Sequence, residues 1–243
     1  MDDYTTATYG DRIADLYDDI YDSPPSEMQI DLLEEMTNGG RALELGIGTG
    51  RLAIPLRARG VSIEGLDSSE AMVSKMRAKD LGSSIPVTIG DFERFDLHKT
   101  FDLIFVAFNT FFGLLTQDAQ TTCFETVATH LSGEGVFLME AFVPDLSRFD
   151  RGQRTSVSHI ALNRTEIDVA LHSPAKQRVD SQTIIIEDEE PARLMPVSLR
   201  YAWPAELDLM ARLAGLQLRS RWGDWDRSPF GDDSGKHVSV WSR

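Results

Sequence analysis

The sequence predicts an α/β fold built on a mostly parallel sheet, and three observations support this. Short apolar runs alternate with helix-period stretches between residues 41 and 142, as in successive βαβ units. A glycine-rich stretch at 46–50 follows the first run, where such folds place a ligand-binding turn. After Asp150 the pattern changes to alternating β-branched segments without helical periodicity, which predicts an added antiparallel insert.

Two helices are expected before the first strand. In "DRIADLYDDIYD" (11–22), apolar side chains recur at three- and four-residue spacing, which predicts one amphipathic helix ended by Pro24 and Pro25. The stretch "SEMQIDLLEEM" (26–36) predicts a second helix with Ser26 as its N-cap, and "NGG" ends it.

The remaining elements complete one sheet. We expect parallel strands over 41–47, 61–67, 86–91, 101–108 and 135–142, and helices over 49–59, 69–79, 117–131 and 204–215. Two final strands, around "LQLRSRWGDW" and "HVSVWSR", form an antiparallel edge hairpin and bring the sheet to seven strands. The expected division is a helical lid and ligand-binding core at 1–150, the antiparallel insert at 151–203, and a C-terminal helix and hairpin at 204–243.

Composition narrows the class of ligand. With 24 Lys and Arg against 39 Asp and Glu, the net charge of -15 repels polyanions, so nucleic acid and anionic membranes are excluded in favour of a small molecule. The single cysteine excludes an internal disulfide, and the acidic N-terminus is unlike a secretory signal, so we expect a cytoplasmic protein. No apolar run is long enough to span a membrane, and no metal-binding motif is present.

The glycine-rich stretch carries the strongest functional signal. Glycines at 46, 48 and 50 give a GxGxG spacing, which differs from the GxGxxG of the dinucleotide fingerprint. Asp67 stands at the end of the second strand, where a carboxylate can accept hydrogen bonds from two ribose hydroxyls. A glycine-rich turn after the first strand, together with an aspartate at the end of the second, suits either NAD or S-adenosylmethionine.

Four ordered motifs decide between these cofactors: "LELGIGTG" (43–50), "GLDSSEAMV" (65–73), "GDFERFD" (90–96) and "FDLIFVAFN" (101–109). Through them the chain resembles the class I S-adenosylmethionine-dependent methyltransferases, which implies a Rossmann-like fold. The tyrosines before the glycines, the insert and the "GDW" near the end resemble small-molecule members, especially those that dimethylate amino sugars.

The resemblance implies a role for each motif residue. The glycines flank the methionyl part of the cofactor, Asp67 holds the ribose, and Asp91 and Phe92 contact the adenine. The full set of implied cofactor contacts is Glu44, Gly46, Gly48, Gly50, Arg51, Asp67, Ser68, Met72, Asp91, Phe92 and Ala107. The implied catalytic set, which closes the site and faces the transferable methyl group, is Tyr9, Tyr17, Tyr21 and Asn109.

The chemistry leaves the methyl acceptor open. In-line displacement at a sulfonium needs alignment more than catalytic groups, so a neutral amine is the favoured acceptor, with Asn109 accepting its hydrogen bond. O-methylation with a histidine base, a non-catalytic cofactor-binding or assembly protein, and nicotinamide chemistry are the alternatives. The insert is expected to roof the pocket or to form a homodimer contact. The expected substrate-binding residues are Phe108, Phe111, Phe112, His159, Trp222, Trp225 and His237, of which the two histidines are the candidate bases.

Overall fold

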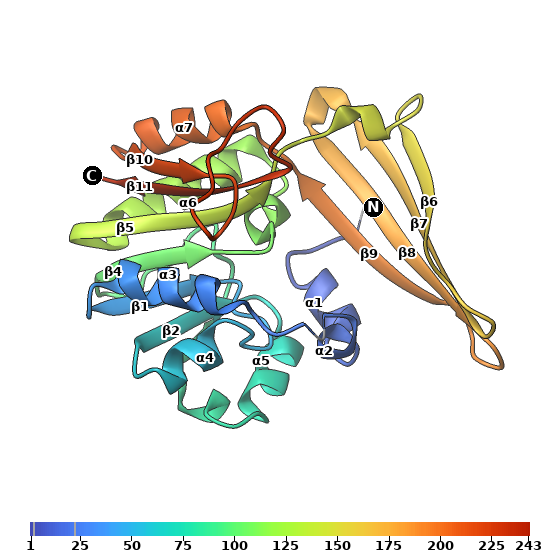
Figure 1. Cartoon of the computed structure of the whole chain (residues 1–243), viewed down its shortest axis with the longest axis horizontal. Coiled ribbons are helices and arrows are strands. Elements are labelled where there is room, and N and C mark those ends of the chain that lie inside the picture. The colour runs from blue at the N-terminus through green and yellow to red at the C-terminus, as the bar shows by residue number, and fades with distance from the viewer. Residues whose placement is uncertain (2, 22) are drawn as a thin grey trace.

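A computed structural model describes residues 1, 3–21 and 23–243. The described residues form two sheets, one of seven strands and one of four (Figure 1). Strand order in the larger sheet is β10-β11-β5-β4-β1-β2-β3. Its parallel strands are β1 (Arg41–Leu45), β2 (Ser62–Asp67), β3 (Val87–Ile89), β4 (Phe101–Val106) and β5 (Leu131–Phe142). The antiparallel edge hairpin is β10 (Gln217–Trp222) and β11 (Lys236–Ser242). The predicted Rossmann-like α/β architecture is therefore confirmed.

Helices cover both faces of this sheet because its strands bury side chains on each side (Figure 1). On one face α3 (Glu27–Thr37), α4 (Ala53–Ala58) and α5 (Glu70–Arg77) pack against residues such as Leu103 and Phe105 of β4. On the other, α6 (Gln117–His130) and α7 (Pro204–Leu213) pack against Ile104 and Val106 of the same strand. Short 3₁₀ turns lie at Gly82–Ser84, Thr110–Gly113, Leu146–Arg148 and Pro174–Lys176.

The insert forms the antiparallel sheet that the sequence predicts. Its strands β6 (Gln153–Ile160), β7 (Arg164–Ser173), β8 (Arg178–Glu187) and β9 (Arg193–Arg200) pair in chain order. In Figure 1 this sheet stands beside the larger one, with the N-terminal helices between them. The contact is apolar, since Ile13 and Ala14 pack with Met72 of α5, Ile185 of β8 and Met195 of β9.

The prediction of one N-terminal helix over 11–22 was wrong. The chain forms α1 (Thr8–Ile13) and α2 (Tyr17–Ile20), with a turn between them, and residue 22 lies outside the described residues. Contacts on two sides override the helical pattern. Ile13 is held in the apolar cluster. Asp15 pairs with Lys75 of α5, and Asp18 pairs with Lys79, which follows that helix. The second predicted helix is present as α3, with the capping box of Ser26 and Gln29.

The close packing of α1 on α5 depends on Gly10. A Cβ at this position would lie 2.6 Å from Ser69 Cβ and 3.1 Å from Met72 Cγ. Ser69 Cβ cannot rotate away, because its position is fixed by the backbone, so α1 itself would have to move. The Ser69 hydroxyl also donates to Asp11 Oδ1 at 2.7 Å, which ties the two helices together.

Gly10→Ala is therefore expected to loosen α1 without unfolding the protein. Overpacking of this kind costs about 1–2 kcal/mol, and tryptic cleavage after the exposed Arg12 should accelerate roughly tenfold, since cleavage reports the open population. Gly133→Ala is the matched control, because a Cβ there meets no atom within 4 Å. Equal cleavage rates in the two variants would contradict the packing role of Gly10.

Candidate functional site

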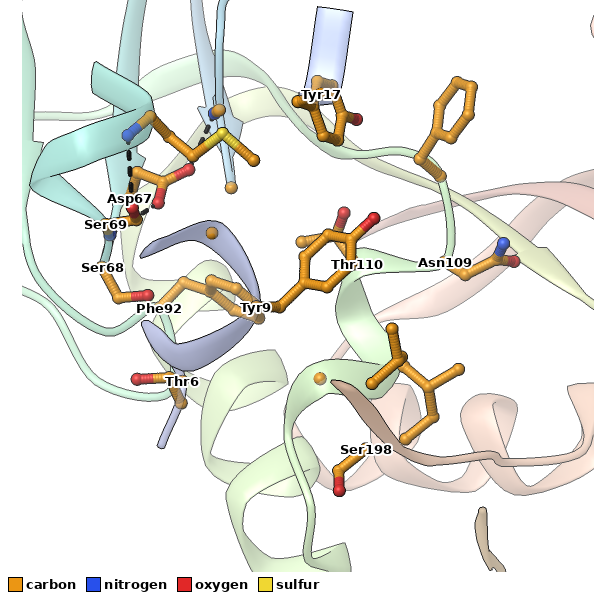
Figure 2. A pocket seen from close by; sticks show the side chains of 18 of the residues that line it. Thr6, Tyr9, Tyr17, Asp67, Ser68, Ser69, Phe92, Asn109, Thr110 and Ser198 are labelled. Atoms are coloured by element: carbon orange, nitrogen blue, oxygen red, sulfur yellow. Dashed lines mark hydrogen bonds between the residues drawn. The ribbon is translucent and has the colours of Figure 1, made fainter. Parts of the chain in front are cut away.

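A cavity of about 300 Å³ lies where β1, β2 and β4 end, and α1, α2 and β9 close it (Figure 2). This is the edge at which open parallel sheets bind ligands. In the view of Figure 2, Asp67 and Ser69 lie on one side, Asn109 on the other, and the ring of Tyr9 between them. The predicted site residues that line it are Tyr9, Tyr17, Tyr21, Gly46, Gly48, Asp67, Ser68, Met72, Phe92, Phe108 and Asn109.

The glycine loop presents bare backbone to the cavity. Gly46 and Gly48 have φ of +72° and +55°, in the left-handed region that favours glycine. A Cβ on Gly48 would meet no protein atom within 4 Å, so the space beside it is open, whereas one on Gly46 would lie 2.4 Å from Thr110 Cγ2. A ligand can therefore approach the main chain closely at Gly48.

Asp67 fixes the loop from the end of β2. Its Oδ2 accepts from the Gly48 N–H at 2.7 Å and its Oδ1 from the Ser69 N–H at 2.8 Å. The carboxylate is buried, and this desolvation raises the pKa of Asp67 although both N–H groups favour the charged form. Each carboxylate oxygen can accept a further hydrogen bond, so the group can also bind two hydroxyls on a ligand.

A smaller cavity of about 40 Å³ adjoins the loop, and three further predicted residues, Glu44, Arg51 and Ala107, line it. Glu44 Oε2 and Arg51 Nη1 are both buried and have no hydrogen-bond partner among the described residues. Burial, together with the charge of Asp67, raises the pKa of Glu44 well above its usual value. Two buried atoms without partners in one cavity, a carboxyl oxygen and a guanidinium nitrogen, suit a ligand that carries both an ammonium and a carboxylate.

Two of the tyrosines that close the cavity, Tyr9 and Tyr17, remain protonated. Tyr9 and Tyr21 share a hydrogen bond between their hydroxyls at 3.1 Å, and the rings of Tyr17 and Tyr21 are 4.7 Å apart. Burial raises the pKa of Tyr17 to about 12 and raises the pKa of Tyr9 further. Tyr9 and Tyr17 can therefore donate hydrogen bonds and line the cavity, but they are poor bases.

The loop after β4 is held in an unusual conformation. Phe108 and Asn109 have φ of +59° and +63°, which is rare for residues other than glycine and often marks functional sites. The Phe108 N–H donates to Glu140 Oε2 at 3.0 Å, and the Phe142 N–H donates to Asn109 Oδ1 at 2.7 Å. One lone pair of the Asn109 oxygen is thus already used, and the other is available to a ligand.

Several expected site residues do not line either cavity. Phe111 and Phe112 are fully buried in the core, because the 3₁₀ turn after Asn109 directs them between α6 and the sheet, so they form no wall of the cavity. Gly50 packs against Met76, since a Cβ on Gly50 would lie 2.6 Å from Met76 Cγ. Asp91 Oδ1 accepts a hydrogen bond from the Glu93 N–H.

The remaining substrate-site predictions also lie elsewhere. Trp225 is buried and donates from Nε1 to Glu140 Oε1 at 2.9 Å, so it supports the loop after β4, while Trp222 packs against the core. His159 is exposed on β6, and His237 is fully buried on β11, where Nδ1 contacts Ser239 Oγ at 2.8 Å. Neither histidine reaches the cavity.

Other lining residues escaped sequence reasoning. They are Tyr4, Thr6, Gly10, Ser69, Thr110, Gly113, Val197, Ser198 and Leu199. Ser69 lies within the motif at 65–73 and Thr110 directly follows the motif at 101–109, so the motifs themselves were a usable signal. The β9 residues reach the cavity only through the packing of the insert sheet, which no local pattern encodes.

The described residues contain no helix long and apolar enough to cross a membrane. Nor do they contain a group of three or more His, Cys, Asp and Glu side chains placed to hold a metal ion.

Comparison with known proteins gives a consistent result. Residues 42–135 match the family model described as a methyltransferase domain. The structure of the CcbJ methyltransferase from Streptomyces caelestis is 36% identical, with 98% of each chain covered and a TM-score of 0.90. The cypemycin N-terminal methyltransferase from Streptomyces sp is 25% identical over 207 residues, 85% of this chain and 84% of the relative.

A third comparison bears on the fold. The structure of S-adenosylmethionine-bound CalS10, an amino pentose methyltransferase from Micromonospora echinaspora, is 20% identical, with 94% of this chain and 96% of that chain covered and a TM-score of 0.69.

The burial of His237 has a consequence for stability. Desolvation and Arg221 lower the pKa of His237 from its usual 6.5 to about 4, so the unfolded chain binds a proton more readily than the folded one between these values. The stability that His237 contributes through this difference in pKa is fully present above pH 6.5 and is lost as the pH falls towards 4. In going from pH 7 to pH 5, His237 should lower the free energy of unfolding by about 2 kcal/mol.

His237→Gln is expected to remove this part of the pH dependence, measured by urea unfolding of both proteins at pH 7 and pH 5. If the free energy of unfolding fell by the same amount between pH 7 and pH 5 in the variant as in the wild type, His237 would not have the lowered pKa.

Proposed function

Because the chain belongs to the class I S-adenosylmethionine-dependent methyltransferases, we propose that it methylates an amine of a small molecule, of natural-product type. The observation that carries this proposal is the lining of the main cavity. Of the described residues that form it, only Asp67 bears a carboxyl group, and it is bound to the glycine loop. Tyr9 and Tyr17 in this lining stay protonated. Such a site suits an amine, which needs to arrive neutral but requires no strong base.

Cofactor binding can be assigned to residues as part of the proposal. We assign the ammonium and carboxylate of the methionyl end to Glu44 and Arg51, because their unpaired buried atoms adjoin the glycine loop. Asp67 would accept from the ribose hydroxyls with its remaining lone pairs. Met72 and Phe92 supply apolar surface for the adenine.

When bound, S-adenosylmethionine supplies a methyl group whose bond to sulfur breaks as the amine nitrogen bonds to carbon. The protein's part is alignment and exclusion of water. Tyr9, Tyr17 and Tyr21 would close the site over the reacting atoms, and Asn109 would orient the amine by accepting a hydrogen bond from its N–H. The amine proton would leave to solvent after transfer.

The alternatives have less support. O-methylation by a histidine base would use His159 or His237, yet neither lines the cavity. A non-catalytic cofactor-binding protein would use the same pocket, so only a transfer assay separates it from an enzyme. The nature of two relatives supports an amine, since one is an N-terminal methyltransferase and another an amino pentose methyltransferase. A cytoplasmic location and a homodimer stay predictions.

The acceptor type can be tested with matched pairs of compounds that differ only in a primary amine or a hydroxyl, including amino sugars, amino acids and short peptides. With labelled S-adenosylmethionine and mass spectrometry, we expect transfer to amines and a rate that rises with pH as the amine loses its proton. Transfer confined to hydroxyl compounds would contradict the proposal. Cofactor binding without any transfer across the panel would favour the non-catalytic alternative.

Glu44→Gln tests the assignment of the methionyl end. Loss of one charge-assisted hydrogen bond should weaken S-adenosylhomocysteine binding by about 2 kcal/mol, roughly thirtyfold. Because the ligand-free pKa of Glu44 is raised and a nearby ammonium favours its ionised form, binding should release a proton and strengthen with pH.

Calorimetry in two buffers of different ionisation enthalpy measures both quantities. Glu64→Gln is the control, because Glu64 lies on β2 and forms an ion pair with Lys99. A variant Glu44→Gln that keeps the wild-type affinity and proton release would exclude this role.

A further inference from the structure

A second and larger cavity, of about 510 Å³, lies on the same face of the insert sheet as the first. The strand register shows this, because Leu199 of β9 pairs with Val179 of β8, and Thr183 of β8 pairs with Asp168 of β7. All four side chains line the second cavity. Its opposite wall is the segment 142–149 that follows β5.

The two cavities share a boundary. Leu199 lines both of them. Asn109, which lines the first, accepts at 2.7 Å from the N–H of Phe142, which lines the second. A molecule whose amine faces Asn109 therefore has the second cavity next to it along the insert sheet.

The charged groups of the second cavity differ in how well they are paired. Asp145 Oδ1 accepts from the Ser147 N–H at 3.0 Å, and Asp168 Oδ1 accepts from Thr183 Oγ1 at 2.6 Å. Arg148 and the half-buried Arg154 have no ion pair and donate no side-chain hydrogen bond to any of the described residues. Arg154 thus offers a half-buried guanidinium group without a partner among the described residues, whereas Arg148 is exposed and its charge, after the hydrogen bonds of Ser147, helps to lower the pKa of Asp145.

The rest of the lining is suited to an organic molecule. Phe142, Val179 and Leu199 give an apolar wall. The Tyr201 hydroxyl lies 2.9 Å from His172 Nε2, and the His172 ring stacks on Phe149 at 4.6 Å between centroids. Tyr201 and Phe149, which also line the cavity, are therefore held in place by His172, which favours a site of defined shape.

We propose that this second cavity binds the part of the acceptor remote from its amine, and that this part carries an oxyanion, a carboxylate or a phosphate, bound by Arg154 and Arg148. The inference rests on the proposed function and narrows its substrate class to amines that also bear an anionic group. A guanidinium pairs with either oxyanion through two parallel hydrogen bonds, and a partly desolvated one gains most from doing so.

The first test measures anion binding directly and needs no acceptor. Inorganic phosphate and acetate are titrated separately into the S-adenosylhomocysteine-saturated protein while ¹⁵N NMR follows the arginine Nε–H signals, with sodium chloride at matched ionic strength as the reference. We expect a saturable shift at Arg154, with a midpoint of about 1 mM, for at least one anion. The shift at Arg154 should weaken in Arg148→Gln and persist in Arg219→Gln, a control at an exposed position on β10. In Arg154→Gln, the anion-dependent shift at Arg148 should weaken in turn.

The second test uses amine acceptors of one length that end in a carboxylate, a phosphate ester or a neutral amide. Arg154→Gln should raise KM about tenfold for the anionic acceptor that the site prefers and leave KM for the amide unchanged. Equal effects on anionic and neutral acceptors would overturn the inference.

The outcomes separate the two proposals. Binding of S-adenosylhomocysteine with no saturable anion shift at Arg154 would overturn the anion site while the proposed function stands. An anion shift at Arg154 in a protein that methylates no amine would support the anion site and count against the proposed function.

Discussion

The rest of the site depends on one carboxylate. Asp67 ends β2 and accepts from the N–H groups of Gly48 and Ser69, so it joins the glycine loop to the start of α5. The Ser69 hydroxyl continues the connection to Asp11 on α1, and Gly10 lets that helix approach closely. The floor of the proposed cofactor pocket and the helix that covers it are therefore fixed from a single strand end. Because this carboxylate is desolvated, it also gains from hydroxyl donors on a ligand.

Another buried carboxylate fixes the loop after β4, on the side of the cavity where we propose that the acceptor binds. Glu140, buried on β5, accepts from the Phe108 N–H and from the Trp225 indole, and so holds the left-handed turn after β4. The insert sheet then supplies Val197 and Leu199 from the other direction. Since Tyr9 and Tyr17 between these walls stay protonated, they are suited to position reactants and poorly suited to remove protons. Specificity must come from surfaces that the core sheet does not itself provide.

Sequence reasoning succeeded where local physics decides the structure. The apolar runs gave the strands of the core sheet, the glycine spacing gave the bare loop, and the β-branched alternation gave the insert. It failed where direction depends on tertiary contacts. Phe111 and Phe112 follow the expected loop, but a 3₁₀ turn directs them into the core. Residue type alone likewise could not predict that His237 faces the interior, or that Trp225 donates a hydrogen bond to the carboxylate of Glu140. The division of the chain at 150 and 203 stays a prediction.

The central claim is that Asp67 organises a pocket for S-adenosylmethionine, and calorimetric titration with S-adenosylhomocysteine tests it most directly. Wild type and Glu64→Ala should bind alike, whereas Asp67→Ala should lose about 2 kcal/mol or more, because two charge-assisted hydrogen bonds to the ribose disappear with the anchor of the loop. NADH should bind to none of the three proteins. Equal affinity of Asp67→Ala and wild type for S-adenosylhomocysteine, or binding of NADH in its place, would contradict the account.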